Sequence, residues 1–507
     1  MAQHDYVIDN STGANVRADI NNALLAISSN NSGSSAPSTN YASQFFANTT
    51  SSIMQLRNTA NNAHINLFSL AGGPAFAVDG TINSVNIGKG ANSVAGNTVL
   101  GESALDASVS GGSNTAIGKE ALTALTSGAS NVAVGANALD ANVTGNSNTA
   151  LGKDALGANT TSSNTAVGAE ALKVNTSGGD NVAVGSNALD ANTTASFNTA
   201  VGEGSLGANT TGAVNTALGR RALNLNTTGA SNTAVGASAL LNQTTGSSNT
   251  ACGESSLQQN TTASNNTAVG YESLKANTTG TQNVAVGALA LDANTTAQEN
   301  TAVGYEALTT TTTGGTNTGI GKQSLRLLTT GSGNTGLGLH GGHDVTTGSN
   351  NMLLGQDAGR SNSPSGSITT ASNTVCIGNS SISAAHIQVA FQTGSDKRDK
   401  TDITDFNFGL DWVNKMRPVT YRWDNRDWYD NGTPDGSKKA PQLELGLIAQ
   451  EELEIEKEFG FGETKEDMLI SSINSNGSYT MKYDRIVPVL INAIKELSAK
   501  VTALEAG

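Results

Sequence analysis

The chain is short of charged and aromatic side chains, and these shortages exclude several classes of protein. Charged residues make up 13% of its 507 residues and aromatic residues 4%, whereas a globular protein has a charged share of about 25%. This is not the composition of an ordinary enzyme of this length. The formal charge of −14 leaves no basic excess to neutralise phosphates, so no nucleic-acid partner is expected.

Long apolar runs, cysteine and proline are scarce as well. No run of about 18 apolar residues occurs, so we expect no membrane-spanning helix and no membrane insertion. The N-terminus lacks the basic and apolar segments of a secretory signal. Cys252 and Cys376 are the only cysteines, too few for a disulfide framework. Glycine is common, with 58 residues, but it does not recur at every third position, which excludes collagen.

The charge that is present is unevenly spread. Residues 1–394 contain 12 basic and 20 acidic residues, and the 113 residues of 395–507 contain 15 and 21. All three tryptophans lie in the second part. We therefore predict a boundary near Gly394–Ser395.

A repeated phrase close to Asn-Thr-Ala-Val-Gly fills the middle of the chain. Fourteen of its 15 intervals are 17 residues long and one is 16. Such a fixed period is typical of a solenoid or a repeat array. The 16 copies begin at Asn97, Asn114, Asn131, Asn148, Asn164, Asn181, Asn198, Asn215, Asn232, Asn249, Asn266, Asn283, Asn300, Asn317, Asn334 and Asn351.

Each position of the repeat predicts part of the fold. The fifth residue is always Gly, which suits a positive φ or a close backbone approach. The fourth is aliphatic except for Cys252, and the ninth is Leu except for Gly342 and Gly359. We expect these two apolar positions to stack into a thin continuous core, with ladders of Asn and Thr side chains beside it. Short β segments fit Asn, Thr and Gly better than helices do.

A single column of such turns buries little apolar surface per layer. We therefore expect several chains to associate side by side, most simply three around one axis; the alternative is a monomeric β-solenoid. The array resembles the Asn-x-Ala-x-Gly repeats in the heads of trimeric autotransporter adhesins and in fibres of tailed bacteriophages. The expected fold class is a mainly β, elongated, trimeric parallel β-repeat of the β-roll or β-solenoid type.

The C-terminal segment has a heptad pattern. Apolar residues are spaced alternately by three and four, as in the a/d seam of a coiled coil. We predict a trimeric coiled coil that ends an α+β domain; a helix packed within a globular domain is the alternative. The seam consists of Val487, Leu490, Ile494, Leu497, Val501 and Leu504.

Four motifs in residues 395–507 resemble the endosialidase-type C-terminal intramolecular chaperone, a self-cleaving domain of phage tail spikes and fibres. They are Ser395-Asp396-Lys397-Arg398-Asp399-Lys400, Met416-Arg417-Pro418-Val419-Thr420-Tyr421-Arg422-Trp423, Gly446-Leu447-Ile448-Ala449-Gln450-Glu451, and Tyr483 with Pro488-Val489-Leu490-Ile491. The resemblance implies a domain that trimerises, guides the upstream β structure to fold, and then cuts itself off between Gly394 and Ser395.

The chemistry of this cleavage is readable in the first motif. A serine hydroxyl needs a base to attack a carbonyl, and a lysine amine can serve. Ser395 and Lys400 are five residues apart, so a turn could bring them together, and the family pattern makes them nucleophile and base. Asp396 and Arg398 are interpreted as positioning or charge-tuning groups. Taken alone, a serine within reach of a lysine is common and seldom catalytic; the four motifs together give it weight.

Other polar groups give weaker signals. The carboxylate-rich run 424–432 does not have the spacing of a calcium loop and is interpreted as a solvated loop. The run Glu451, Glu452, Glu454, Glu456 and Glu458 is interpreted as an exposed helix face. His340 and His343 have no evident third ligand. We therefore expect no metal and no cofactor.

Residues 1–70 are predicted to attach the protein to a larger assembly. Val16, Ile20, Leu24 and Ile27 form a helical stripe, residues 28–40 a linker and residues 45–70 a β-hairpin. This segment resembles N-terminal regions of tail fibres from phages of marine cyanobacteria, although a simple capping domain is the alternative. Residues 71–394 form the repeat shaft.

Two classes of function are considered. The first is a trimeric tail fibre or spike of a tailed phage, located in the virion after synthesis in the host cytoplasm. Its expected partners are virion tail or neck proteins at the N-terminus and an unidentified host cell-surface receptor. Self-processing is then the only enzymatic activity. The alternative is a trimeric bacterial surface adhesin. A glycan-degrading fibre is disfavoured because residues 1–394 offer no acid pair.

Overall fold

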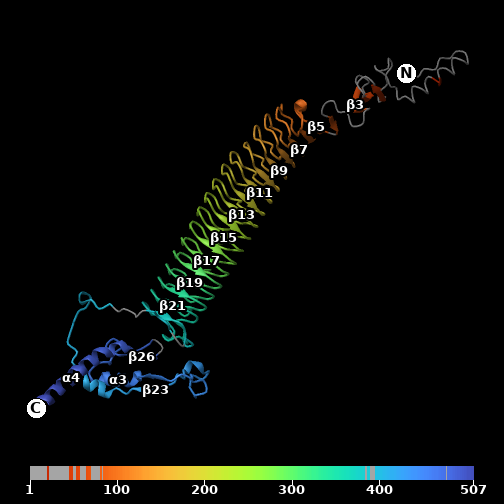
Figure 1. Ribbon diagram of the computed structural model, residues 1–507. Coiled ribbons are helices and arrows are strands. Elements are labelled where there is room, and N and C mark those ends of the chain that lie inside the picture. Colours follow the sequence, from red (N-terminus) through yellow and green to blue (C-terminus); the bar gives the residue numbers. More distant parts are fainter. Residues whose placement is uncertain are drawn as a thin grey trace, which may run out of the picture. The chain divides into compact units, whose positions relative to one another are not determined.

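The computed structural model describes residues 20–21, 45–48, 53–57, 64–69, 80–82, 84–382, 385–388, 394–474 and 477–507. The chain divides into two compact units, Met1–Asn215 and Thr216–Gly507, shown as ribbons in Figure 1. Apart from residues 20–21, the predicted helical stripe and linker lie outside the described residues. No described helix is both long and apolar enough to cross a bilayer.

The first unit begins with antiparallel strands. β1 (Phe45–Asn48), β2 (Ile53–Arg57) and β3 (His64–Ser69) form a three-stranded sheet, so the hairpin predicted here is present. β4 (Gly80–Ile82) and β5 (Val85–Gly88) then pair antiparallel with each other, and β5 pairs antiparallel with the first repeat strand. This hairpin covers one edge of the parallel sheet, an edge that would otherwise be open to another strand.

Every repeat contributes one short strand to a parallel β-solenoid, as expected for the repeat array. Equivalent residues pair from one turn to the next, for example Ala166 with Ala183. In the first unit the strands are β6 (Thr98–Gly101), β7 (Thr115–Ile117), β8 (Val132–Val134), β9 (Thr149–Leu151), β10 (Thr165–Val167), β11 (Val182–Val184) and β12 (Thr199–Val201). In the second they are β13 (Thr216–Leu218), β14 (Thr233–Val235), β15 (Thr250–Cys252), β16 (Thr267–Val269), β17 (Val284–Val286), β18 (Thr301–Val303), β19 (Thr318–Ile320), β20 (Thr335–Leu337), β21 (Met352–Leu354) and β22 (Val375–Ile377).

The core of each turn differs from the prediction at one position. The ninth residue is buried as expected, and Leu223 and Leu240 are examples. The fourth residue points outward instead: Leu218 is 48% exposed, while Ala217 beside it in the strand is fully buried. Side chains alternate along a strand, so a buried third residue turns the second and fourth to the other face. The prediction of an inward fourth position was therefore wrong.

The backbone explains the invariant glycine. Gly253 has a φ of +138°, and a Cβ at this position would lie 2.4 Å from the carbonyl oxygen of Gly270. The ninth residue also has a positive φ, +50° in Leu257, at a cost of about 1–2 kcal/mol for a residue with a side chain. Leu257 is nevertheless fully buried, so its burial in the core must offset that strain.

Asparagine and threonine ladders run along the stack, as predicted. The Asn at position one is buried, and its Oδ1 accepts the backbone N–H of the next Asn, as between Asn249 and Asn266 at 3.0 Å. Threonines in the Asn-Thr-Thr-Gly turn donate to the carbonyl of the equivalent residue one turn on, as Thr244 does to Thr261 at 3.1 Å. The ladders satisfy polar groups that a stack of turns would otherwise bury without partners.

The last turns depart from the repeat. Gly342 and Gly359 replace the buried Leu, and Leu353 stands where most copies have Ala. A Cβ on Gly342 would lie 2.6 Å from Cδ1 of Leu353, so this larger side chain fills the space left by the missing Leu. The loop before β22 is six residues longer than a regular turn and places Ile368 in the core.

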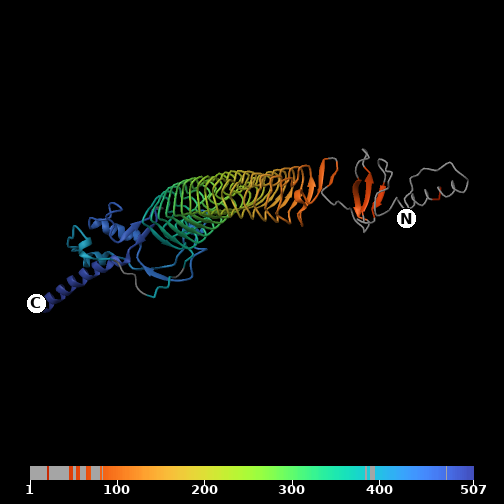
Figure 2. The same cartoon turned by 90° about the horizontal axis from the view of Figure 1, so that it is seen from above.

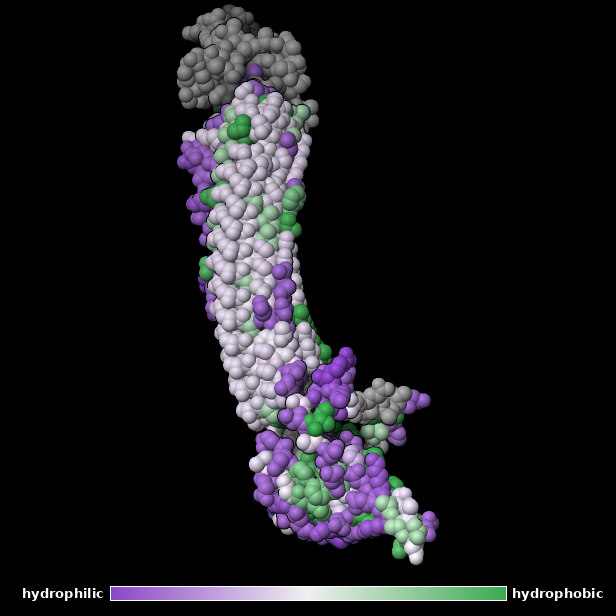
Figure 3. All heavy atoms as spheres, turned by 90° about the vertical axis from the view of Figure 1, so that its left-hand side faces the viewer, coloured by the Kyte–Doolittle hydropathy of each residue, from purple (hydrophilic) through white to green (hydrophobic). Residues whose placement is uncertain are grey.

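The C-terminal domain is α+β. Its elements are η2 (Lys397–Asp399), α2 (Leu410–Lys415), β23 (Val419–Tyr421), η3 (Arg426–Trp428), β24 (Glu444–Gly446), α3 (Ala449–Glu458), β25 (Ser471–Ile473), β26 (Tyr479–Met481), η4 (Tyr483–Arg485) and α4 (Ile486–Ala506). Its core is built on Trp412, which stacks on Phe459 with ring centroids 4.8 Å apart and packs with Ile455, Ile470 and Val489. On the face drawn in Figure 3 this domain carries most of the strongly hydrophilic residues, and the repeat turns are mostly near neutral.

Candidate catalytic site

A single tight turn brings the predicted serine and lysine together. Asp396 precedes the short helix η2, and its carboxylate accepts the backbone N–H of Arg398 at 2.9 Å. The chain reverses over this one turn, so Lys400 returns to the start of the segment. Its Nζ donates a hydrogen bond to Oγ of Ser395 at 2.7 Å. The two side chains are thus within reach of each other, as their predicted roles as nucleophile and base would require.

Asp396 and Arg398 form an ion pair on the same turn. The guanidinium of Arg398 donates to both carboxylate oxygens, with Nη2 2.6 Å from Oδ2. These hydrogen bonds lower the pKa of Asp396 and raise that of Arg398. The pair lies on the turn that brings Ser395 and Lys400 together, and the predicted positioning role rests on this contact.

The cleavage segment is open to solvent. Residues 394–402 are all exposed, and a Cβ placed on Gly394 would meet no atom within 4 Å. The peptide bond between Gly394 and Ser395 is therefore accessible. For a lysine to act as base, its amine must be neutral and accept the serine proton.

Two of the other motifs contact each other in the domain. Arg417 forms an ion pair with Glu451, which joins the motif that contains β23 to the motif that begins α3. The hydrogen bonds lower the pKa of Glu451 and raise that of Arg417. Both residues are exposed, so this pair adds little stability, and its value lies in orienting the two motifs.

The remaining motif residues also meet in space. The hydroxyl oxygen of Tyr483 accepts the backbone N–H of Leu447 at 3.0 Å. A Cβ on Gly446 would lie 2.6 Å from that oxygen, so the Tyr483 contact requires glycine at this position. Three motifs that are spread over more than 60 residues of the sequence are thus joined by the Arg417–Glu451 and Tyr483–Leu447 contacts.

The acidic run of α3 was predicted to be an exposed helix face. Glu454 and Glu458 are exposed, but the prediction is wrong for two of the five members of the run. Glu452 and Glu456 are buried. Oε1 of Glu452 accepts the indole N–H of Trp412 at 2.8 Å, and burial raises the pKa of this carboxyl. The carboxylate of Glu456 accepts the backbone N–H groups of Leu469, Ile470 and Ser471 at 2.5–2.9 Å. The two side chains lie four residues apart, on one face of the helix, and this spacing was the available signal.

Helix α4 has two apolar faces. Val489 and Ala493 are buried against the domain, and Glu496 accepts the backbone N–H of Leu410 at 3.0 Å. The predicted seam faces solvent instead, with Ile494 67% and Leu504 82% exposed. From residue 497 onward every residue is exposed, and the helix extends beyond the rest of the domain (Figure 2).

The helix itself is as predicted, while the coiled coil remains a prediction. A free segment of three turns is marginal in water, where isolated helices shorter than about 12–15 residues are barely stable. The exposed seam is the surface that the predicted coiled coil would bury.

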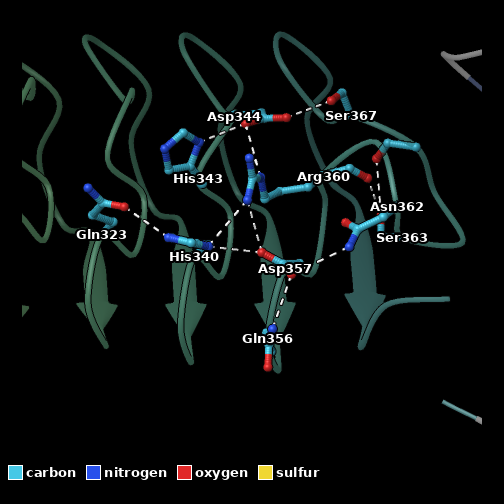
Figure 4. Close-up of polar contacts among 11 residues, drawn as sticks. Gln323, His340, His343, Asp344, Gln356, Asp357, Arg360, Asn362, Ser363 and Ser367 are labelled. Carbon is cyan, nitrogen blue, oxygen red and sulfur yellow. Dashed lines mark hydrogen bonds and ion pairs between the residues drawn. The ribbon is translucent and has the colours of Figure 1, made fainter. Parts of the chain in front are cut away.

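The two neighbouring histidines lie in the last turns of the solenoid (Figure 4). Nδ1 of His340 is 3.0 Å from Oδ1 of Asp357, and Nδ1 of His343 is 2.7 Å from Oδ1 of Asp344. Arg360 donates to Asp357 at 3.0 Å. His340 and Asp357 occupy equivalent positions of consecutive turns, and Arg360 also lies 3.6 Å from Asp344 of the preceding turn. The polar cluster therefore links the final turns to one another.

Both carboxyl groups of this cluster favour their charged form. Burial alone would raise the pKa of Asp344, but the hydrogen bond from Ser367 and the charge of Arg360 outweigh it and lower the pKa. Burial is likewise outweighed at Asp357, mainly by the hydrogen bond from Arg360, and its pKa is lowered. Among the described residues, no group of three potential metal ligands is present.

The carboxylate-rich loop at 424–432 also has an internal role. Asp424 accepts the hydroxyl of Tyr429 at 2.5 Å and the backbone N–H of Gly436 at 2.9 Å. Its carboxylate therefore holds a loop of the domain together, in keeping with a structural interpretation of this run.

Comparison with known proteins identifies the C-terminal part. Residues 395–461 match the family model of the chaperone of endosialidase, and the match starts at the serine of the Ser395–Lys400 pair. The match confirms the resemblance to the endosialidase-type chaperone domain over residues 395–461; the motif at Tyr483 and Pro488–Ile491 lies beyond the matched residues. No curated protein and no solved structure gives a significant match to the chain.

Proposed function

We propose that the chain is the subunit of a trimeric tail fibre of a tailed phage, and that its C-terminal domain aligns three chains and then removes itself. The observation that carries the proposal is the contact of Ser395 with Lys400 at 2.7 Å, at the first residue of the segment that matches the chaperone family. A nucleophile and a base thus stand at the bond whose cleavage would separate the β-solenoid from the chaperone domain.

The cleavage reaction follows from these groups. The neutral amine of Lys400 takes the hydroxyl proton of Ser395, and Oγ attacks the carbonyl carbon of Gly394. The amide nitrogen leaves with the proton returned by the lysine, which gives an ester between Gly394 and the serine oxygen. Water then hydrolyses the ester to a C-terminal carboxylate on Gly394 and a free hydroxyl on Ser395. The same bonds are made and broken, and the same proton is moved, whether Ser395 attacks the carbonyl carbon of Gly394 in its own chain or in a neighbouring chain.

Assembly before cleavage explains two features of the domain. The exposed seam of α4, with Leu497 51% and Val501 45% exposed, gives three chains a place to meet. The Ser395–Lys400 turn is open to solvent in the single chain. Packing of further chains around the turn would exclude water from the serine hydroxyl and from the peptide bond it attacks. Cleavage then follows trimerisation.

The remaining roles complete the proposal. Residues 1–70 attach the fibre to tail or neck proteins of the virion, because they are the part of the chain outside both the repeats and the chaperone domain. The solenoid projects toward the host and takes part in attachment to a cell-surface receptor.

Substitution of the serine tests the proposal. Ser395→Ala should give a folded trimer in which the full 507-residue chain persists, and Lys400→Ala should do the same. Lys397→Ala is the matched control, because this exposed lysine lies on the same turn, and it should cleave normally. Denaturing gels and intact-mass measurements read the result. Loss of the 113-residue fragment from Ser395→Ala at the normal rate would contradict the assignment.

A second experiment tests the chaperone role without the cleavage chemistry. A chain that ends at residue 394 should fail to assemble, because it lacks the element that aligns the ends. Efficient assembly of this shortened chain, seen by sedimentation, would refute that role.

A further inference from the structure

One face of the solenoid carries no charge in either unit. The outward second and fourth positions of β6 to β12, and those of β13 to β22, are occupied by Thr, Val, Leu, Ile, Met and Cys alone. Charged residues lie on other parts of the turn, as in the pairs Lys153–Asp154 and Lys275–Glu272. The outward fourth-position side chains are half-buried or exposed: Leu151 is 47% and Leu337 46% exposed, while Val235 and Val303 are half-buried.

A bare face of this kind is unusual for a parallel sheet. Parallel sheets are normally covered on both faces, yet here the inner face packs on the turns and the outer face meets solvent. In the second unit, ten three-residue strands form a strip about 10 Å wide and about 45 Å long. The strip is uncharged: a continuous row of fourth-position aliphatic side chains, broken only by Cys252, lies beside a second-position row that is mainly threonine. A contiguous row of exposed aliphatic side chains of this length marks an interaction surface.

The regular spacing of the repeat indicates which kind of partner can pack on the strip. Each layer presents nearly the same pair of outward side chains at the strand spacing of about 4.8 Å. A partner can make equal contacts in every layer only if it repeats with that spacing. Another copy of this chain does so, whereas a globular protein or a small ligand would match a few layers at most. The absence of charge also suits a face that meets its own kind, because like charges would repel.

We infer that this face of the solenoid is the surface through which three copies pack, with their sheets turned toward a common axis. The inference rests on the proposed trimeric fibre and adds the surface that holds its shaft together. It also accounts for the outward fourth position, since these aliphatic residues are buried between chains and not within one chain.

Cys252 provides a native probe of this arrangement. It occupies the fourth position of β15 and is exposed, whereas Cys376 is buried. Sheets of three-residue strands packed around an axis place each Cys252 within about 10 Å of its counterparts. A bismaleimide of that span adds to one thiolate at each end, so it should join two chains of the native trimer. Crosslinked dimers on denaturing gels are the expected result, and Cys252→Ser should abolish them.

A second thiol on another side of the same turn is the matched control. Thr262 is exposed and lies outside the sheet strip, so Thr262→Cys in the Cys252→Ser background should react with a bulky maleimide but form no dimers. Cys252 in the wild-type assembly should resist the bulky reagent. The inference is overturned if sedimentation gives a wild-type trimer, the bulky maleimide labels its Cys252 as fast as it labels the thiol of Cys252→Ser/Thr262→Cys, and the bismaleimide forms no dimers through Cys252. The trimeric fibre itself would survive that result. A monomer by sedimentation would instead refute the proposed function together with this inference.

Discussion

Removal of the Glu456 carboxylate should abolish folding of the chaperone domain. This buried side chain accepts three backbone N–H groups, from Leu469, Ile470 and Ser471. In Glu456→Ala all three donors lose their acceptor inside the protein, at about 1–3 kcal/mol each. The total of about 3–9 kcal/mol compares with a stability of about 5–15 kcal/mol for a whole domain. Since the domain must fold before it can align chains, trimerisation and self-cleavage should fail together.

Two further variants make the prediction quantitative. Glu456→Gln keeps one oxygen, which can still accept two N–H groups, but turns its amide toward the third, so about 1–3 kcal/mol should be lost and cleavage should be slowed. Glu454→Ala is the control: this exposed residue of the same helix pairs with Lys457 at the surface, and its loss should change stability by less than about 1 kcal/mol. The assay follows release of the 113-residue fragment from the full chain over time. Normal trimer and normal cleavage in Glu456→Ala would show that this carboxylate does not hold the domain together.

Two predictions concern the solenoid. Asn249→Ala removes the acceptor of the buried Asn266 N–H and a donor to the buried carbonyl of Ala263. The free energy of unfolding, measured by denaturant unfolding of the full chain, should fall by about 2–6 kcal/mol. An equal loss in Thr262→Ala would contradict the ladder's role. Acid should loosen the last turns: Asp344 and Asp357 have lowered pKa values, so their stabilisation holds above the unfolded pKa of about 3.9 and disappears as pH falls through the lower folded values. The protection of amides in these turns, measured as the exchange rate relative to that of an unfolded peptide at the same pH, should therefore fall between pH 5 and pH 3, and Asp344→Asn/Asp357→Asn should remove that difference.

The repeat made most of the shaft predictable. A period that recurs 16 times fixes which residues are equivalent, so parallel pairing, the asparagine ladder and the glycine turn follow without knowledge of distant contacts. The side of the sheet on which the fourth residue lies does not follow in the same way. Leu218 and Ala217 are both apolar, and hydrophobicity alone suggested that the larger one is buried. In a three-residue strand only one residue faces inward, and the space inside the turn, already occupied by the ninth-position Leu, admits the smaller.

In the chaperone domain, local sequence patterns predicted the Ser395–Lys400 turn but not the burial of charged residues in α3. The spacing of Ser395 and Lys400 allowed a turn, and the structure contains that turn; whether the pair is catalytic remains a prediction. Glu452 and Glu456 were misjudged because their charge suggested solvent. Their partners are Trp412 and three backbone N–H groups of the segment after α3, which no pattern within the helix reveals. A buried carboxylate is tolerated only when such donors satisfy it, and donors of the main chain leave no trace in a sequence.

In the proposed trimer, the outward strip and the chaperone domain have separate tasks, packing for the strip and alignment for the domain. Within a chain, covalent linkage forces each turn to stack on the one before it, so the sheet keeps its own register. Between chains no such link exists, and a shift of one whole repeat places Val235 of one copy where Cys252 of another would be, with nearly the same contacts. The strip can therefore hold the three chains together, but it does not set their register relative to one another. Alignment must come from parts that do not repeat, and the exposed seam of α4 is such a part.

Once three shafts are packed in register, each layer of one chain contacts the same layer of the other two chains. A slide by one repeat would then require all of these contacts along the strip to be broken at once. The aligned state is then kept by a kinetic barrier, so the domain that set the register can be removed.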